Sequence, residues 1–338
     1  MNHNDHDIQL MNKDISSDFF ALVKEAESIA LTTHIHSDGD GMVTCFALQE
    51  IMKASGFDST IVTDGEELDR YAFLMRYTKV QAFHEDMDFG LVIVLDCNSY
   101  DRIGNRHTLL DKARKVAVLD HHMIEHNHIP ADLQLVDYSY PSVGALIWRS
   151  MRETIQKLNP AVRKYVADCV YVSILNDSNN FSNANTNATM FEISAELAQE
   201  GIKAHELHMA YLQNHSAKEM LYVGRSLSTI RLFEDGKYLF LHSDKALAEE
   251  LDVDPSAYMS VTRWVQGISG LSAIAYFRED EPGMWKISLR SLILDMHEVA
   301  ARHGGGGHRQ ASGLTLMGSL QEVQEVILHD LKQANSLS

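Results

Sequence analysis

The chain has 338 residues, of which 45% are hydrophobic, and this size suits one large core or about two smaller ones. Its formal net charge of −18 argues against a duplex-DNA binder, because long nucleic acid is held mainly through neutralised phosphates, but it leaves open a small anionic substrate. No apolar run could cross a membrane, residues 1–7 lack a signal-peptide core, and three scattered cysteines fit reduced thiols, so we expect a cytoplasmic protein.

Short apolar runs alternate with helical patterns in the first half of the chain. The helical patterns cover residues 41–54, 142–158 and 162–175. The predicted strands cover residues 28–33, 59–63, 91–95, 116–119 and 133–136. Strands that alternate with helices predict a doubly wound parallel sheet, and we place this α/β domain at residues 14–190.

The second half of the chain predicts a smaller domain of a different type. Helical patterns at 187–201 and 204–224, without a Pro- or Gly-rich linker, favour a helical connector over residues 191–226. Residues 227–338 then predict two β-hairpins, which turn at 234–236 and 281–283, and a further strand at 314–317. Helices are expected at 256–265, 294–302 and 320–335. This pattern favours an α+β domain with a mixed sheet.

Acidic residues and histidines follow several predicted elements of the first domain. Asp120, His121 and His122 follow the 116–119 strand, where the chemistry of open α/β sheets is found. A solvated turn would explain this tripeptide alone, but other elements are followed by the same residue types, namely His34, Asp38, Asp40, Asp96 and Asp177. Carboxylates gathered in one place repel one another unless cations neutralise them. Carboxylate with imidazole is a ligand set for Mn²⁺, Fe²⁺, Co²⁺ or Zn²⁺, and the lack of cysteine disfavours a structural zinc site.

These residues, in this order, resemble the DHH phosphoesterase superfamily, in the branch with a DHH-associated C-terminal domain. The family's four N-terminal motifs match His34, Asp38 and Asp40, then Asp96, then Asp120, His121 and His122, and finally Asp177 with Ser178. Its C-terminal signature matches the glycine run and histidine at 304–308, the small residues 311–313, and Arg290-Ser291 upstream. The resemblance covers residues 28–313.

The resemblance implies two divalent metal ions, with Mn²⁺ as the expected metal. His34, Asp38 and Asp96 would hold the first ion. Asp40, Asp96, His121 and Asp177 would hold the second, so that Asp96 bridges the pair. A water shared by two metals becomes a hydroxide near neutral pH.

The resemblance also implies roles for residues around the metals. Asp120 would orient a ligand histidine, and His122 would face the phosphate or the leaving oxygen as a donor or general acid. Arg102 stands where relatives keep an arginine, although a structural ion pair explains it equally well.

The chain departs from the family pattern at two places. His36 and Ser37 replace a polar residue and a proline, so His36 could meet solvent, phosphate or metal. Relatives often continue the fourth motif as Thr-Gly-x-Phe-Arg, but residues 178–182 are Ser-Asn-Asn-Phe-Ser. The arginine after Phe181 is missing, which weakens any substrate assignment borrowed from members that have it.

Four glycines and a histidine occupy residues 304–308. A flexible surface loop would explain them, but their place before an expected helix start favours a phosphate site. There the backbone N–H groups of Gly305, Gly306 and Gly307 could cradle the anion. Arg290, with Ser291 beside it, and His308 would add directional donors. We interpret this segment as a substrate platform that faces the metals across a cleft and selects short substrates.

The resemblance implies a metal-dependent hydrolase of short oligoribonucleotides, of 3′-phosphoadenosine 5′-phosphate, or of both. The alternatives are a phosphodiesterase for cyclic or linear dinucleotides and a RecJ-like single-strand exonuclease, although RecJ relatives are typically longer. A manganese pyrophosphatase has a different C-terminal domain. A non-enzymatic nucleotide sensor on the same fold would normally have lost metal ligands, and none is lost here. A homodimer, the metal's identity and the physiological substrate are left open.

Overall fold

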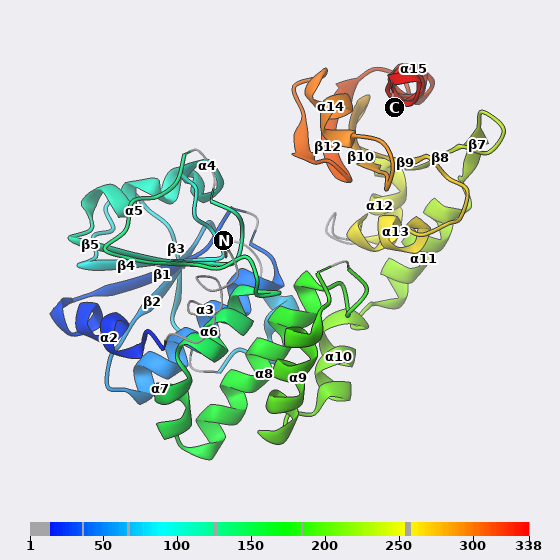
Figure 1. Ribbon diagram of the computed structural model, residues 1–338. Coiled ribbons are helices and arrows are strands. Elements are labelled where there is room, and N and C mark those ends of the chain that lie inside the picture. Colours follow the sequence, from blue (N-terminus) through cyan, green and yellow to red (C-terminus); the bar gives the residue numbers. More distant parts are fainter. Residues whose placement is uncertain are drawn as a thin grey trace, which may run out of the picture. The chain divides into compact units, whose positions relative to one another are not determined.

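The computed structural model describes residues 14–35, 37–65, 68–76, 78–124, 127–183, 185–253 and 258–337, so the question of His36 lies outside the described residues. The chain divides into two compact units, Met1–Asn214 and His215–Ser338 (Figure 1). The boundary falls inside the 191–226 segment, whose role as a connector stays a prediction. None of the described helices combines the length and the apolar character needed to cross a bilayer.

The first unit is built on a six-stranded sheet with the order β3-β2-β1-β4-β5-β6, and each neighbouring pair is parallel. The strands are β1 (Ile29–Thr32), β2 (Thr60–Thr63), β3 (Val80–Ala82), β4 (Leu91–Leu95), β5 (Lys115–Asp120) and β6 (Leu133–Val136). The chain runs outward from β1 to β3 and returns through β4 to β6 on the other side. The predicted doubly wound parallel sheet is thus confirmed, and sequence analysis missed only the short β3.

Helices cover both faces of this sheet, as Figure 1 shows. One face carries α2 (Ser16–Glu25), α3 (Gly39–Ala54), α6 (Val143–Ser150), α7 (Arg152–Lys157) and α8 (Pro160–Asp177). The other face carries α4 (Tyr100–Ile103), η2 (Gly104–Arg106) and α5 (His107–Lys112). Neighbouring strand residues therefore enter different cores: Ile93 belongs to the α3 side, and Val92 and Val94 belong to the α5 side. Burial on both faces explains why these strands are continuous apolar runs.

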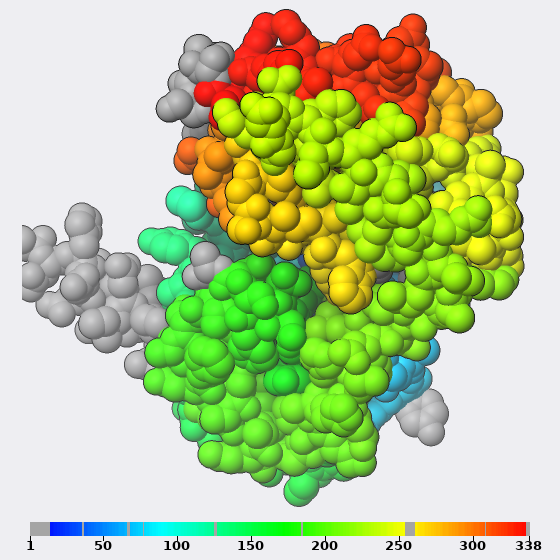
Figure 2. All heavy atoms as spheres, turned by 90° about the vertical axis from the view of Figure 1, so that its right-hand side faces the viewer, coloured from blue at the N-terminus to red at the C-terminus, as the bar shows by residue number. Residues whose placement is uncertain are grey.

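Two of the predicted helices are wrong as single elements. The 142–158 pattern is divided into α6 and α7 at Met151, whose φ of −116° and ψ of 24° leave the helical region. The 204–224 pattern is divided into α10 (Ala204–Leu212) and α11 (Ala217–Leu227). Ser216 and Glu219 form a capping box that starts α11, so the new helix begins at a local polar signal that follows the polar residues 213–215. Before α10, the chain also forms η1 (Asp69–Tyr71) and α9 (Ala188–Gln199). In Figure 2, residues of this unit drawn in green lie at the surface that faces the viewer.

The second unit has a mixed six-stranded sheet with the order β11-β12-β10-β9-β8-β7, which confirms the predicted α+β type. Its strands are β7 (Arg231–Phe233), β8 (Tyr238–Ser243), β9 (Ala273–Glu281), β10 (Met284–Arg290), β11 (Gly306–His308) and β12 (Ala311–Met317). Only β8 and β9 pair in parallel. The helices are α11, α12 (Lys245–Leu251), α13 (Tyr258–Val265), α14 (Met296–Ala301) and α15 (Leu320–Leu337). They again form two cores, with Phe240 on the α15 side and Leu241 on the α11 side.

The glycine run does not precede a helix, so that part of the sequence interpretation is wrong. Gly306 pairs with Gly313 and His308 pairs with Ala311, which makes β11 one arm of an antiparallel hairpin. Gly306 and Gly307 can form a strand here because β12 supplies the hydrogen-bonding partner, which local helix signals cannot reveal.

Candidate metal centre

The carboxyl ends of β1, β4 and β5 meet where the strand order reverses. β1 and β4 are neighbours in the sheet, but the chain leaves them in opposite directions, which opens a crevice between the loops that follow. β1 is followed by His34, β4 by Asp96, and β5 ends in Asp120 with His121 after it. The sheet topology alone therefore brings together polar residues that lie far apart in the sequence.

The first group of candidate ligands surrounds His34. Its Nε2 lies 3.4 Å from Asp96 Oδ2 and 3.8 Å from Asp38 Oδ1. Asp38 also caps α3, because its Oδ1 accepts a hydrogen bond from the N–H of Asp40 at 2.9 Å. The ligand atoms of His34, Asp38 and Asp96 all lie within 4.8 Å of one another, which is close enough to share one cation.

The second group surrounds His121. Its Nε2 lies 2.9 Å from Asp177 Oδ2, 3.3 Å from Asp40 Oδ2 and 3.4 Å from Asp96 Oδ1. Asp96 thus directs Oδ2 to His34 and Oδ1 to His121, and it belongs to both groups by contact. The same Oδ1 also lies 3.3 Å from His122 Nδ1, so Asp96, His121 and His122 form a third group of possible ligands. The structure therefore brings all six predicted metal ligands into one cluster.

Asp96 occupies an unusual position for a carboxylate. It is 1% exposed, its φ of 59° lies in the left-handed region, and its Oδ1 has no hydrogen-bond donor among the described residues. The facing Nε2 of His121 is also buried and makes no hydrogen bond of good geometry there, although Asp177 Oδ2 lies 2.9 Å away. Buried polar atoms are nearly always satisfied, and a cation between these two would satisfy both. The strained backbone and the unpaired atoms together fit a bound divalent metal.

Both ligand histidines are oriented by backbone carbonyl groups. His34 Nδ1 lies 2.8 Å from the oxygen of Ile35, and His121 Nδ1 lies 3.3 Å from the oxygen of Tyr140. A carbonyl oxygen can only accept, so each Nδ1 must carry the proton. Each Nε2 therefore faces the carboxylates, where it holds a proton when no metal is bound and offers its lone pair to a metal once that proton is lost, as in a metal-ligating histidine.

The electrostatics of the cluster also favour a cation. Burial opposes charge on His34, but Asp38 and Asp96 outweigh it and raise its pKa to about 10. Burial likewise opposes charge on His121, yet Asp177, Asp96 and Asp40 raise its pKa to about 12. Burial and the neighbouring carboxylates of Asp177 and Asp96 raise the pKa of Asp40 well above its usual range. Without metal, protons on the imidazoles supply the positive charge that the carboxylates require.

Asp40 is fully buried and held by groups from distant parts of the chain. Its carboxylate accepts hydrogen bonds from the N–H groups of Val143 at 2.8 Å and Gly144 at 3.3 Å, at the start of α6. Ser173 Oγ of α8 donates to it at 2.5 Å. A Cβ at Gly144 would lie 2.3 Å from Ser173 Oγ, so this contact needs glycine. Sequence analysis missed Ser173 and Gly144. The only local signal near them was Ser142, which caps the start of α6 where these contacts to Asp40 are made.

Asp120 contacts a different imidazole from the one expected of it. Its Oδ1 lies 2.8 Å from His122 Nδ1, and it reaches His121 only through that residue's backbone N–H at 2.7 Å. Asn98 Nδ2 donates to the other oxygen of Asp120 at 2.5 Å. The side chain of His122 is 35% exposed, whereas that of His121 is 9% exposed. His122 is therefore the imidazole of this cluster that solvent and substrate can reach, and Asn98 is a supporting residue that sequence analysis missed.

Arg102 and the turn that follows Asp177 are two further features that the sequence singled out. Arg102 lies half-buried in α4, its carbonyl accepts from the N–H of Ile35 at 2.8 Å, and its guanidinium has no ion pair within the described residues. Asn179, Asn180 and Phe181 have φ values of 46°, 58° and 60°, a left-handed turn that replaces the family's usual sequence. Ser178 Oγ supports this turn, since it accepts from the N–H of Phe181 at 2.8 Å.

The candidate substrate residues of the second unit have structural contacts. Ser291 Oγ donates to the Ser272 carbonyl at 2.7 Å and accepts from Leu294 N–H at 2.8 Å. Arg290 donates to the carbonyl of Leu289 at 2.9 Å. A Cβ at Gly305 would lie 2.3 Å from Gly313 O and one at Gly307 2.6 Å from Ala311 O, but Gly306 has open space. Close packing thus explains two of the glycines, and the side chain of His308 lies outside the description.

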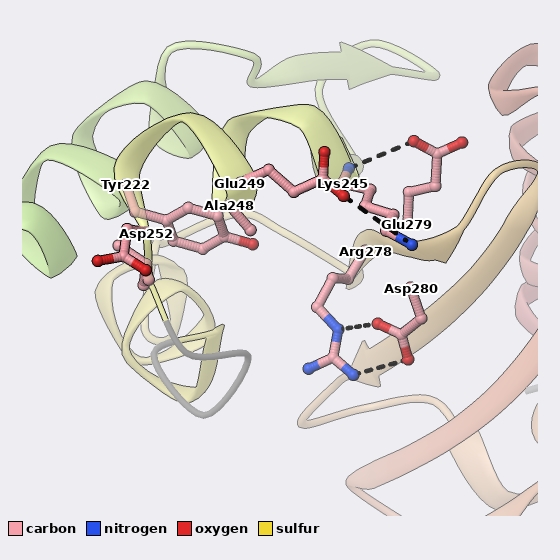
Figure 3. Close-up of a pocket in the computed structure, with 9 residues that line it drawn as sticks. Tyr222, Lys245, Ala248, Glu249, Asp252, Arg278, Glu279 and Asp280 are labelled. Atoms are coloured by element: carbon pink, nitrogen blue, oxygen red, sulfur yellow. Dashed lines mark hydrogen bonds and ion pairs between the residues drawn. The ribbon is translucent and has the colours of Figure 1, made fainter.

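A cavity of about 550 Å³ also occurs in the second unit, between α11, α12 and β9 (Figure 3). None of the predicted site residues lines it. Its cationic groups are already paired: Arg278 binds Asp280 through two nitrogens, and Lys245 Nζ lies 2.5 Å from Glu281. This cavity therefore lacks the unpaired polar atoms that distinguish the cluster around Asp96.

Comparisons with known proteins show which families and relatives this chain is similar to. The model of the DHH family, N-terminal domain, matches residues 28–174, and that of the DHHA1 domain matches residues 243–336. The bifunctional oligoribonuclease and PAP phosphatase NrnA of Mycoplasma pneumoniae is 25% identical over 329 residues, 96% of this chain and 98% of the relative. Its Thermus thermophilus namesake is 28% identical over 317 residues, 91% and 92% of the two chains. An exopolyphosphatase-related protein from Bacteroides fragilis shares the fold, with a TM-score of 0.85 at 19% identity over 95% and 96% of the chains.

Proposed function

We propose that this phosphoric ester hydrolase, whose chain matches the models of the DHH family, N-terminal domain, and of the DHHA1 domain, hydrolyses short oligoribonucleotides, 3′-phosphoadenosine 5′-phosphate, or both. The observation that carries this proposal is the buried carboxylate of Asp96 between the imidazoles of His34 and His121. That arrangement suits a pair of divalent cations at the reacting phosphate.

We assign the metal ligands as the two groups that share Asp96. His34, Asp38 and Asp96 would hold one ion, with Asp40, His121 and Asp177 completing the second group around the same carboxylate. We expect Mn²⁺, which this carboxylate and imidazole set suits. When bound, two such cations lower the pKa of a shared water and stabilise charge on the attacked phosphate.

His122 is the proposed proton donor to the leaving oxygen. Its Nδ1 is held by Asp120, so Nε2 is the nitrogen left to serve the substrate. Breaking the P–O bond of a ribonucleotide diester leaves an alkoxide, which needs a proton at once. Asn98 fixes the carboxylate of Asp120 and, through it, the orientation of the His122 ring.

The second unit is proposed to bind the part of the substrate that does not react. Arg290, Ser291 and His308 and the N–H groups of residues 305–307 are the candidate contacts, as set out from the sequence. The net charge of −18 disfavours a long polyanionic strand, so turnover is expected to fall as the oligonucleotide lengthens beyond a few residues. Arg102, which has no carboxylate partner among the described residues, is a further candidate contact. We expect the enzyme to act in the cytoplasm, and a homodimer remains a prediction for sedimentation analysis.

One substrate panel tests the proposal. Purified protein with Mn²⁺, Mg²⁺, Fe²⁺ or Co²⁺ is assayed on di- to pentaribonucleotides, a long single strand, 3′-phosphoadenosine 5′-phosphate and cyclic dinucleotides. Fast turnover of dinucleotides with slow turnover of the long strand is the expected result. Equal rates on both would favour a single-strand exonuclease, and preference for cyclic dinucleotides would favour a cyclic-dinucleotide phosphodiesterase. Tight nucleotide binding without turnover by any metal form would favour a sensor.

A further inference from the structure

A chain of hydrogen bonds connects an exposed arginine to the metal cluster of the first unit. Arg70 in η1 donates from Nη2 to Tyr211 Oη of α10 at 3.1 Å. Tyr211 Oη donates to Asn176 Oδ1 at 2.5 Å, and Asn176 Nδ2 donates to Asp177 Oδ1 at 3.0 Å. Neither Arg70 nor Tyr211 belongs to a motif found in the sequence, and 141 positions separate them.

The guanidinium of Arg70 is held against two aromatic rings. Its central carbon lies 5.1 Å from the ring centroid of Tyr71 and 5.1 Å from that of Tyr211. The two rings are 6.3 Å apart and inclined by 20°. Tyr71 is itself buried and packs edge-on against Phe46 of α3 at 6.2 Å. A planar cation supported in this way loses little conformational entropy when it binds an anion.

The close approach of Tyr211 to the cluster requires a glycine. A Cβ at Gly39, the first residue of α3, would lie 2.0 Å from Tyr211 Oη. The N–H of Gly39 also donates to Asn176 Oδ1 at 3.3 Å. Gly39 stands between the ligands Asp38 and Asp40, so the tyrosine hydroxyl reaches the immediate surroundings of the cluster.

Arg70, like Arg102, differs in its partners from the arginines of the first unit that form ion pairs. Arg106, Arg149 and Arg163 each form an ion pair with a carboxylate. Arg70 forms none within the described residues, and the Tyr211 hydroxyl accepts only one of its five N–H groups. Burial opposes its charge, but Tyr211, Tyr71 and Asp38 raise its pKa, which places the cation within the field of a candidate metal ligand. In a chain with a net charge of −18, a solvent-facing cation without a carboxylate is available to an anionic ligand.

We propose that Arg70 binds a non-bridging oxygen of the phosphate held at the metal centre, an assignment that rests on the proposed function. Guanidinium N–H groups match an oxyanion in two-point geometry, which suits phosphate better than a single ammonium does. Tyr71 and Tyr211 position the guanidinium. The hydrogen bonds through Tyr211 and Asn176 fix its position relative to Asp177. Arg70 would then contribute both to phosphate binding and to stabilising charge in the transition state.

The test compares Arg70→Gln and Arg70→Lys with a matched control, Arg76→Gln. Arg76 lies in the same segment and over a tyrosine ring, that of Tyr165 at 4.0 Å, but it has no cluster residue among its described contacts. The affinity of the Mn²⁺-loaded protein for inorganic phosphate is measured by calorimetry, alongside bound metal and diribonucleotide turnover. We expect Arg70→Gln to weaken phosphate binding by about tenfold or more and to lower kcat/KM by about 10², the scale of a lost oxyanion donor.

The remaining outcomes separate the alternatives. The phosphate affinity and turnover of Arg70→Lys should lie between those of wild type and those of Arg70→Gln. Added guanidinium ion should restore part of the activity of Arg70→Gln. Both Arg70 variants should retain full metal content, and Arg76→Gln should match wild type in phosphate affinity, bound metal and turnover. Unchanged phosphate affinity in folded Arg70→Gln, or in Arg70→Lys if the glutamine variant does not fold, would overturn the proposal. Loss of metal from the arginine variants would overturn it as well, because Arg70 would then act only through Asn176 and Asp177. If no nucleotide is hydrolysed by wild type, the proposed function fails, while the phosphate titrations still decide the role of Arg70.

Discussion

The two units of this chain differ in how completely their buried polar side chains are hydrogen-bonded. In the second unit, Ser226, Ser243, Tyr276 and Tyr222 form an unbroken chain of hydroxyl contacts, and Arg278 is paired with Asp280. Among its described residues, no buried side-chain nitrogen or oxygen lacks a hydrogen-bond partner. The first unit instead has several such atoms, including Ser16 Oγ and Ser59 Oγ, and two of them, Asp96 Oδ1 and His121 Nε2, face each other in the ligand cluster.

This difference fits a ligand site in the first unit. A satisfied polar network stabilises a fold and needs nothing from solution, whereas an unsatisfied buried pair is costly unless a ligand completes it. The parallel sheet allows this arrangement because its topology directs three strand ends to one crevice. Four experiments test this difference between the units.

The largest effect is expected from Asp96→Ala. Loss of the carboxylate shared by both ligand groups should remove most bound metal and reduce turnover below detection, because the remaining ligands cannot shield two adjacent cations. Metal analysis and diribonucleotide turnover give the readouts. Asp280→Ala in the second unit is the matched control and should leave metal content unchanged. Two full equivalents of metal with normal turnover in Asp96→Ala would rule out a bridging role.

Histidines from the two units should affect different kinetic constants. His122→Ala should lower kcat by a factor of about 10², the scale of lost general acid–base help. His308→Ala should raise KM for nucleotides, since its proposed contact is with a part of the substrate that does not react. Both variants are assayed on a diribonucleotide and on bis(p-nitrophenyl) phosphate. If His308→Ala slowed the small ester as much as the nucleotide, the proposed division between the units would be wrong.

Metal binding should release protons from the first unit. The carboxylates raise the pKa of His34 to about 10 and that of His121 to about 12, so both imidazoles carry protons at pH 7 without metal. A cation must displace these protons, and its affinity should therefore rise with pH and fall as pH is lowered. His242 of the second unit differs, because burial lowers its pKa. Calorimetric Mn²⁺ titrations in buffers of different ionisation enthalpy measure the release, and a heat independent of buffer would contradict it.

The smallest effect is expected from a supporting serine. Ser173→Ala removes the hydroxyl that donates to Asp40, and metal affinity should fall by about tenfold, as for other residues that orient a metal ligand. Ser243→Ala is the matched control, because Ser243 is also buried and hydrogen-bonded but lies in the second unit. It should lower the free energy of unfolding by about 1 kcal/mol without changing metal affinity. Equal metal affinities in the two variants would show that Ser173 does not support metal binding through Asp40.

The local sequence determined the parallel sheet and the family. Apolar runs such as 91–95 predicted buried strands because burial on both faces demands continuous apolar residues. The polar residues that follow these runs, including Asp96 and His121, were identified because strand ends in such sheets meet at one edge. Family motifs then singled out all seven residues that the structure gathers into overlapping groups, namely the six predicted ligands and His122.

Only the tertiary structure revealed the contacts that complete the cluster. Ser173 reaches Asp40 across 133 positions of sequence, and Arg70 reaches Tyr211 across 141, so no local pattern could pair them. The glycine run became a strand because β12 pairs with it, although its sequence suggested the approach to a helix. Hydrophobic periodicity indicates which residues of a single helix or strand are buried. Hydrogen bonds and strand pairing between elements depend instead on the fold of the whole chain.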